Sequence, residues 1–292
     1  MKPASFRYAA ARSVTEAVDL LSEHSDAAKL LAGGQSLVPM MNLRLSRPEI
    51  LIDLNRIPQK DGIYVERGAL RVEMLARQRS AERSELVRAN LPILAEAISQ
   101  IGHSQIRSRG TLVGSCCHAD PSAEIPAVLA AVDGSVRLEG SQGLRDVPSQ
   151  DFFLGFFQTA LAPDEVATDL VFPLPPAGTG ASFLEFARRH GDFAIVGVAA
   201  LVTLGSDGSI ARAALALAGV GPACVRASQA EAFLTGKRAE PTAFAEGARL
   251  ASQEIEPQSD VQASEGYRRE LARTLVERAL ATAAARAVRE VA

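Results

Sequence analysis

The sequence predicts an α+β protein of two domains, and three observations lead to that prediction. Strand-like and helix-like segments alternate up to about residue 173. A run rich in proline and glycine, PLPPAGTG (173–180), then marks a linker. Apolar strand-like segments follow it, and a C-terminal stretch rich in Ala, Glu and Arg predicts helices. Separate runs of strands and of helices are typical of an α+β arrangement.

The segment 1–55 predicts a compact unit of strands and helices. Ser13 and Glu16 have the spacing of a capping box, which predicts the start of a helix. Apolar side chains continue at helical spacing on one face of it: Val14, Ala17, Val18 and Leu21. A short strand over 27–31, a helix that begins just after Ser36, and an apolar strand over 50–54 complete the unit.

Between this unit and the linker, the pattern predicts a second lobe. Strands are expected at 68–75, 136–140 and 165–173, and a helix at 91–101 with Pro92 in its first turn. Beyond the linker, three strands are expected, the last two joined by the turn GSDGS, and a long helix from about Val261 closes the chain. Those strands correspond to 181–189, 194–204 and 210–220.

The stretch LLAGGQSLVPMMNLRL (30–45) places two glycines between a strand and a helix. Glycine lets the main chain turn sharply and approach a ligand closely. Unpaired amides at a helix start favour an anion, so a phosphate is one candidate ligand. Most strand–glycine–helix junctions are only turns, however, so the glycines by themselves do not establish a phosphate site. The stretch is neither a P-loop, which needs Gly-Lys-Ser/Thr, nor the G-x-G-x-x-G fingerprint.

A second small-residue segment is RSRGTLVGSCCHADPSAEIP (107–126). Its glycines and hydroxyl side chains predict a loop that could approach a polar ligand, with an acidic residue beyond it to bind a ribose. His118 and Asp120 could belong to a metal site, but the four histidines form no ligand cluster. Cys117 next to His118 could be a nucleophile, but no nucleophile-elbow motif is present. Cysteines that fill small core spaces are the simpler interpretation.

The composition excludes several classes of function. A net charge of −3 gives no electrostatic reason for binding nucleic acid or an anionic membrane, and tryptophan is absent. The sequence shows no secretory signal and no apolar run long enough to span a bilayer, so no membrane insertion is expected. Three cysteines make no disulfide framework and cannot hold an iron–sulfur cluster. A cytoplasmic location is therefore expected.

Together, the two segments resemble the FAD-binding medium subunit of the molybdenum hydroxylases, the family of carbon monoxide dehydrogenase and xanthine dehydrogenase. Five pieces match in order: LLAGGQSLVPMMNLRL (30–45), ILIDL (50–54), IRSRGTLVGSCCHADPSAEIPAVLAA (106–131), FFLGFFQTALAPDE (152–165) and EFARRHGDFAIVGVAA (185–200). The resemblance implies a two-lobed vanillyl-alcohol-oxidase-type FAD domain over 1–175, with lobes of about 1–55 and 56–175. It also implies a smaller domain over 176–292, with a three-stranded antiparallel sheet and a helical bundle.

The resemblance also implies which residues bind FAD. In the first segment, the pyrophosphate would lie on the main chain of a loop flanked by three leucines. In the second, small residues and two acidic residues would continue the site, and three apolar residues would line the flavin end. The implied set is Leu30, Leu31, Ala32, Gly33, Gly34, Gln35, Ser36, Leu37, Ile101, Thr111, Gly114, Ser115, Asp120, Glu124, Leu161 and Phe193.

Several positions depart from the family pattern. The family motif Asn-Arg-Gly-Thr-Ile-Gly-Gly-Ser has Ser108 and Val113 here. A β-branched residue tolerates positive φ poorly, so either the chain at Val113 is extended or the loop is shifted. Glu124 replaces an aspartate that contacts the adenosine ribose in the family. Glu185 replaces a lysine, which puts a charge contact with the cofactor there in doubt.

The implied function is electron transfer, with no catalytic acid or base and no metal ligand in this chain. A molybdenum cofactor in a large subunit and two 2Fe–2S clusters in a small subunit would deliver electrons to FAD, in a dimer of heterotrimers. A free-standing FAD oxidoreductase and a flavin-free scaffold remain alternatives. A subunit of a molybdenum-dependent reductase of aromatic thioesters is a third alternative. Such a subunit would carry an extra cysteine-bound cluster, and the three cysteines of this chain argue against it. The charged side chains of Arg268, Arg269, Glu270 and Arg278 form either a docking surface or a solvated helix face.

Overall fold

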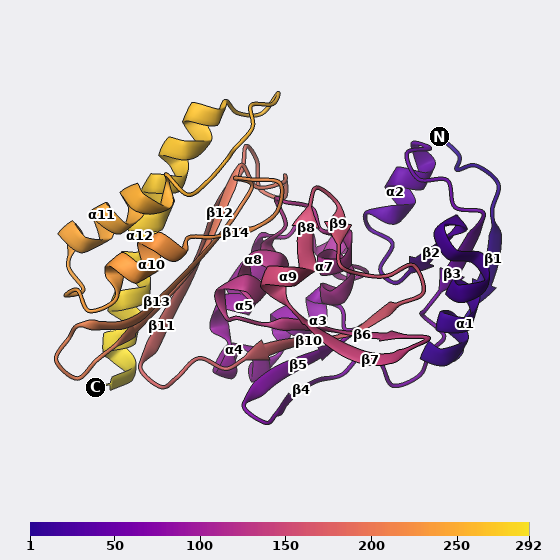
Figure 1. The fold of residues 1–292 in the computed structure, drawn as a ribbon, viewed down its shortest axis with the longest axis horizontal. Helices are drawn as coiled ribbons and strands as arrows, with labels where there is room; N and C mark the ends of the chain where they lie inside the picture. The colour runs from indigo at the N-terminus through magenta and orange to yellow at the C-terminus, as the bar shows by residue number, and fades with distance from the viewer. Residues whose placement is uncertain (292) are drawn as a thin grey trace.

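The computed structural model describes residues 1–291. Figure 1 shows an elongated molecule in three parts that follow the chain from one end to the other. A small N-terminal lobe occupies one end, a second lobe lies in the centre, and a sheet covered by helices occupies the other end. The expected lobes and the C-terminal domain are therefore all present.

The N-terminal lobe is a parallel sheet of order β1-β3-β2 with two α-helices. Ser13 Oγ caps the first helix by accepting the N–H of Glu16, and the Glu16 carboxylate accepts the N–H of Arg12 rather than that of Ser13. The four apolar residues of that helix are buried, as their spacing predicted. The elements are β1 (Arg7–Ala10), α1 (Val14–His24), η1 (Ser25–Ala27), β2 (Ala28–Leu31), α2 (Leu37–Asn42) and β3 (Ile50–Asp53).

The second lobe is an antiparallel sheet of order β4-β5-β10-β6-β7 packed with short helices, plus a small hairpin, β8-β9. Its strands are β4 (Ile63–Glu66), β5 (Ala69–Glu73), β6 (Ser135–Gly140), β7 (Gly143–Pro148), β8 (Phe153–Gly155), β9 (Gln158–Thr159) and β10 (Val166–Pro173). Its helices are α3 (Gln78–Arg83), α4 (Glu85–Asn90), α5 (Pro92–Gln100), α6 (Ser104–Arg107), α7 (Leu112–His118), α8 (Glu124–Ala131) and α9 (Ser149–Phe152).

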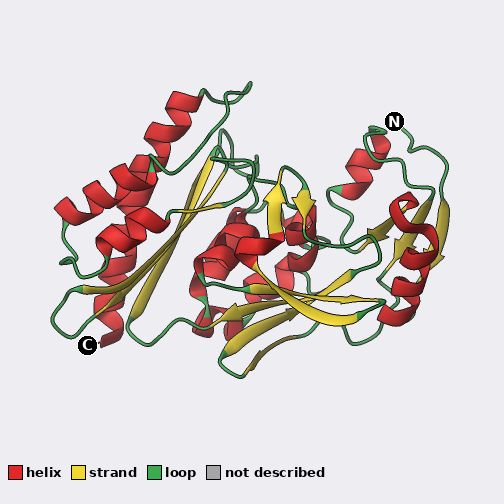
Figure 2. Ribbon diagram, viewed as in Figure 1, coloured by secondary structure: helices red, strands yellow, loops and turns green. Residues whose placement is uncertain are grey.

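Residues 174–178 lie between β10 and β11, inside the expected linker 173–180, whose outer residues belong to the two strands. The three expected strands form an antiparallel sheet, and a fourth strand of two residues extends it in the order β11-β12-β13-β14. Helices cover one face of this sheet (Figure 2). The elements are β11 (Thr179–Phe186), β12 (Val196–Leu204), β13 (Ile210–Ala218), β14 (Val225–Arg226), α10 (Ser228–Leu234), α11 (Pro241–Ala251) and α12 (Glu265–Val291).

Strand β12 is buried on both faces, which explains its continuous apolar sequence. Val198, Ala200 and Val202 pack in the core formed with α10–α12. The alternate residues Ala199 and Leu201 pack in the larger core shared with both lobes of the first domain. Because successive side chains of a strand point to opposite faces, one strand joins the two cores.

Two of the arginines considered for a docking surface serve the interior of the C-terminal domain instead. Arg268 is 6% exposed, and its Nη1 donates to the carbonyl oxygens of Ile195 and Gly219. Arg269 donates to the carbonyl oxygens of Ser252 and Ile255. Both side chains hold α12 in place; Arg268 is buried there, whereas the side chain of Arg269 is still 36% exposed.

Candidate cofactor-binding site

The first glycine segment leaves a row of main-chain N–H groups unpaired. Within residues 1–291, the N–H groups of Gly33 through Leu37 donate no hydrogen bond to the chain. Gly34 has φ +72°, which turns the loop into α2, and the Gln35 side chain donates to the carbonyl of Gly33 at 3.0 Å. Consecutive unpaired amides of this kind form a binding surface for an anion.

Residues Leu112–His118 of the second segment form the helix α7, although a loop was expected there; Gly110 and Thr111 just before it are not helical. Thr111 Oγ1 accepts the N–H of Gly114 at 3.1 Å and so caps the start of α7. Threonine is one of the residues preferred at the N-cap of a helix. Val113 lies inside this helix and is buried, so its backbone is neither extended nor at positive φ. The valine is therefore accommodated without strain. Ser115 is half-buried in the same helix.

The two segments are in direct main-chain contact. A Cβ atom placed on Gly33 would lie 2.6 Å from the carbonyl oxygen of Arg109 and 2.8 Å from Cα of Gly110. Such distances leave no room for a side chain, so glycine at 33 allows the two segments to meet. Gly110 in turn packs against Gln78 of α3 on its other side.

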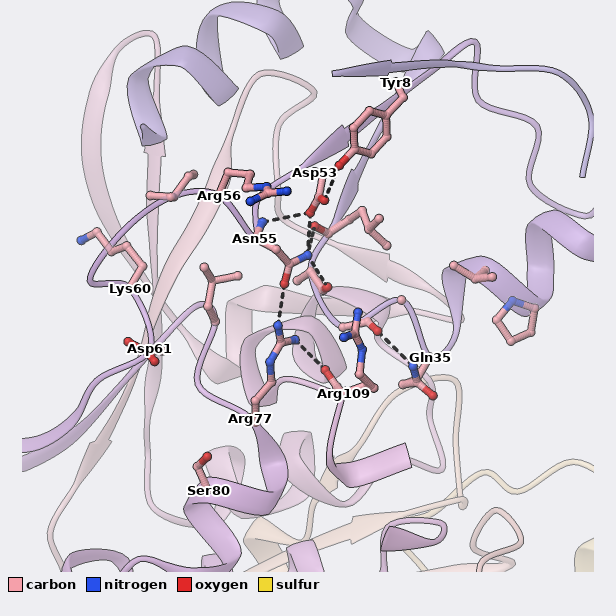
Figure 3. A pocket seen from close by; sticks show the side chains of 18 of the residues that line it. Tyr8, Gln35, Asp53, Asn55, Arg56, Lys60, Asp61, Arg77, Ser80 and Arg109 are labelled. Carbon is pink, nitrogen blue, oxygen red and sulfur yellow. Dashed lines mark hydrogen bonds between the residues drawn. The ribbon is translucent and has the colours of Figure 1, made fainter. Parts of the chain in front are cut away.

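A polar cavity of about 810 Å³ lies beside the first segment (Figure 3). Five of the predicted residues line it, Leu31 through Gln35 in sequence. Thr111, Gly114, Ser115 and the more distant predicted residues do not line it. Its other side chains carry more positive than negative charge: Arg56, Lys60, Arg77 and Arg109 against Asp53 and Asp61.

A chain of hydrogen bonds crosses this cavity between the two lobes (Figure 3). Tyr8 donates to Asp53 at 2.6 Å, and Asn55 donates to the other Asp53 oxygen at 2.5 Å. Arg77 donates to Asn55 at 2.5 Å and to the carbonyl of Arg109 at 2.6 Å. Burial and the charge of Arg109 lower the pKa of Arg77. Partial burial by itself would raise the pKa of Asp53. The hydrogen bonds from Tyr8 and Asn55 outweigh this effect, so the pKa of Asp53 lies below its ordinary value.

The remaining predicted residues lie further along the second lobe. Asp120 Oδ1 accepts the N–H of Ser122 at 2.9 Å, which shapes the loop before α8. Ile101 and Leu161 are partly buried against the core, whereas Phe193 is 62% exposed. The structure therefore does not gather all the predicted residues into one cavity.

Glu124 is buried and Glu185 is half-buried, and neither carboxyl group has an ion-pair partner among the described residues. Glu124 is 8% exposed, and burial raises its pKa to about 7. Burial and the nearby charge of Glu124 raise the pKa of Glu185 to about 8. One oxygen of Glu185 is buried without a hydrogen bond within the described chain. Both groups are therefore able to hold a proton near neutral pH.

The cysteines fill small spaces in the interior, in agreement with the simpler interpretation. Cys116 is fully buried, and burial raises the pKa of Cys117 and Cys224 to about 12. Thiols with so high a pKa are unreactive at neutral pH. Among residues 1–291, no group of three or more His, Cys, Asp or Glu side chains could hold a metal ion.

Sequence reasoning missed three residues of the cavity network: Asn55, Arg77 and Arg109. Asn55 follows directly after the predicted strand 50–54, where polar side chains at the end of a parallel strand often face a site. The position of Asn55 at the end of a predicted strand could therefore have indicated that its side chain faces a site. Arg77 gives no such signal, because its contact with Arg109 joins residues separated by 32 positions.

The fold and the site define a class of protein: a two-lobed α+β domain with a row of unpaired main-chain N–H groups beside a polar cavity, joined to a sheet-and-helix domain. Residues 4–175 match the family described as "FAD binding domain in molybdopterin dehydrogenase", and residues 181–283 match the "CO dehydrogenase flavoprotein C-terminal domain". The chain belongs to this family. It is an FAD-binding subunit of a multi-subunit molybdenum-containing dehydrogenase, and hence a component of an oxidoreductase.

Relatives match over nearly the whole chain. The 6-hydroxypseudooxynicotine dehydrogenase complex subunit alpha of Paenarthrobacter nicotinovorans is 42% identical, covering 98% of this chain and 97% of that protein. The carbon monoxide dehydrogenase medium chain of Hydrogenophaga pseudoflava is 38% identical, with coverage of 98% and 99%. A solved carbon monoxide dehydrogenase from that organism superposes with a TM-score of 0.95 at 40% identity, covering 98% of this chain and 99% of its own.

Quinoline 2-oxidoreductase from Pseudomonas putida 86 is also similar in structure, with a TM-score of 0.93 and 34% identity. The match covers 98% of this chain and 99% of that one. Relatives with different substrates thus share one subunit architecture. A separate finding concerns membranes: among the described residues, none of the helices is both long and apolar enough to cross one.

Proposed function

We propose that this chain holds FAD extended between its two lobes, with the pyrophosphate on the main chain of Ala32–Ser36. The observation that carries the proposal is the row of unpaired N–H groups from Gly33 through Leu37, packed against the second segment. These fixed amides offer hydrogen bonds to phosphate oxygens at no cost of reorganisation. Thr111, Gly114 and Ser115 would complete the pyrophosphate site from the other lobe, with Leu30, Leu31 and Leu37 supporting the first loop.

The flavin would lie toward the C-terminal domain, next to Ile101, Leu161 and Phe193. The exposed ring of Phe193 is free to contact it. Asp120 and Glu124 would bind cofactor hydroxyls, and a protonated Glu124 can donate as well as accept a hydrogen bond. Bound FAD supplies the electron-transfer chemistry, while this chain supplies its orientation and surroundings.

We further propose that electrons enter from two 2Fe–2S clusters of a small subunit and leave to an external acceptor. A large subunit would carry the molybdenum cofactor, and two heterotrimers would form the complete enzyme in the cytoplasm. Relatives are named as subunits or medium chains of their enzymes, which supports an assembly of several subunits. We assign residues 1–175 to the FAD domain, with lobes of about 1–55 and 56–175, and residues 176–292 to the second domain.

Titration of the cofactor-free chain with FAD tests the binding mode. We expect one FAD per chain, quenched flavin fluorescence, and loss of binding in Gly34→Val, because valine at φ +72° distorts the cradle. Gly208→Val is the matched control: Gly208 has φ +76°, lies in the β12–β13 turn, and has nothing near its Cβ position. A folded wild-type chain that takes up no FAD, alone or with its partner subunits, would refute the proposal.

A further inference from the structure

Two side chains connect the two segments of the cradle without belonging to either. Asn55 follows β3 in the N-terminal lobe, and Arg77 precedes α3 in the second lobe. Both are half-buried and line the cavity, where Figure 3 shows them joined by a hydrogen bond. Neither takes part in the FAD site described above.

Their hydrogen bonds run from one segment to the other. Asn55 Nδ2 donates to the carbonyl of Ala32 at 2.9 Å, and Asn55 Oδ1 accepts Arg77 Nη2 at 2.5 Å. Arg77 Nη1 donates to the carbonyl of Arg109 at 2.6 Å. Ala32 directly precedes Gly33, and Arg109 directly precedes Gly110. The bridge therefore ends on the two residues adjacent to the glycines at which the segments meet.

The lobes do not depend on this bridge to stay together. One continuous core contains α1 and β3 of the first lobe and the sheet of the second lobe. Helix α1 packs against β6 and β10. Removing a polar bridge at the rim leaves that core intact, so its effect falls on the relative position of the two loops.

We propose that Asn55 and Arg77 are positioning residues that set the spacing between the two main-chain segments of the FAD cradle. This inference rests on the proposed binding mode. The planar guanidinium presents two N–H groups at a fixed angle, one for each partner, whereas a lysine ammonium is a point charge on a flexible stem. Because the two loops must contact one diphosphate together, a shift of one loop weakens binding to both.

The experiment compares FAD binding by the full-length cofactor-free chain and its variants: Asn55→Ala, Arg77→Met, Arg77→Lys and the double variant Asn55→Ala/Arg77→Met. Arg83→Met is the matched control, since Arg83 is the last residue of α3, the helix that Arg77 precedes, and is exposed. FAD affinity comes from fluorescence titration. The ³¹P NMR shifts of the bound diphosphate, at saturating FAD, report cradle geometry independently of stability.

We expect each single variant to weaken FAD binding about tenfold or more and to shift the bound phosphorus resonances, with Arg83→Met unchanged. The double variant should lose no more than the larger single loss, because both changes break the same bridge. Arg77→Lys should fail to restore affinity. If Arg77→Met does not fold, Asn55→Ala and Arg77→Lys still decide the question.

Three results would overturn the inference. Affinity within twofold of wild type in Asn55→Ala and Arg77→Lys would show that spacing does not depend on the bridge. Full rescue by lysine would show that Arg77 acts as a charge that contacts the ligand directly. A wild-type chain without FAD binding would instead refute the proposed function, and the bridge would then be only a contact between lobes.

Discussion

The cradle and the C-terminal sheet both depend on a glycine at a main-chain contact, but for opposite reasons. Gly33 lets the first segment meet Arg109 and Gly110 of the second, while the N–H groups of Gly33 through Leu37 stay unpaired within the described residues. Under the proposed function, a ligand completes this contact. Gly180 lets β11 meet α12 inside a closed core, where a Cβ atom would lie 1.9 Å from the carbonyl oxygen of Ala283. The same residue type thus serves binding in one region and stability in the other.

The largest expected effect is that of Gly180→Ala on folding. The added Cβ overlaps the main chain of α12 at Ala283 and Ala287, so the helix must move away from the sheet. We expect a loss of about 3 kcal/mol or more in the free energy of unfolding, measured by urea denaturation. Gly266→Ala, in the first turn of α12 with open space around it, is the control and should be neutral or stabilising. Equal unfolding free energies of Gly180→Ala and Gly266→Ala would contradict the close contact between β11 and α12 at Gly180.

Gly33→Ala tests the other half of the comparison. Its Cβ overlaps the main chain at Arg109, and the loops can separate toward the open cavity. We expect a smaller loss of stability, about 1–2 kcal/mol, together with at least a tenfold loss of FAD affinity by titration. If Gly33→Ala destabilises the chain as much as Gly180→Ala but keeps FAD binding, the distinction between the two regions is wrong.

Glu185→Gln should change the dependence of stability on pH. Burial holds the pKa of Glu185 near 8 and that of Glu124 near 7, against an ordinary value of 4.5. From about pH 4.5 to pH 8, the folded chain therefore retains protons that the unfolded chain releases, and the free energy of unfolding falls as pH rises. Glutamine does not titrate in this range, so Glu185→Gln removes this contribution to the pH dependence of stability.

We accordingly expect Glu185→Gln to be more stable than the wild type by about 1 kcal/mol near pH 9 and equally stable near pH 4. Thermal unfolding of the cofactor-free chain across this range measures the difference. Glu165→Gln serves as a contrast, because Arg145 lowers the pKa of that carboxyl. A pH-independent difference between wild type and Glu185→Gln would show that Glu185 is not buried as a neutral acid.

The smallest effect compares two helix caps. Thr111→Val and Ser13→Ala each remove a side-chain oxygen that accepts an N–H at a helix start, at 3.1 and 3.0 Å. Each should cost about 1 kcal/mol in unfolding free energy. Only Thr111→Val should also weaken FAD binding, because α7 lies at the cradle and α1 does not. Equal FAD affinity in the two variants would remove Thr111 from the site.

Much of the fold was predictable because its signals are local. The cap at Ser13, the helix that begins after Ser36, the linker after β10 and the apolar run of β12 each follow from residues close in sequence. The second glycine segment was wrongly expected to be a loop. Thr111 and the residues after it suit a helix start as well as a turn, and only the packing of Leu112, Val113 and Cys116 in the core decides between them.

The sequence by itself determined the family, the elements with a clear local pattern and the glycines of both segments, because these depend on residue type and spacing. Only the tertiary structure decided what those glycines touch. It placed Gly33 against Gly110, joined Asn55 to Arg77 across the lobes, and brought Glu124 near Glu185 in a buried environment. The physical reason is that burial and contact between distant segments set hydrogen bonding and pKa, and neither can be read from neighbours in the chain.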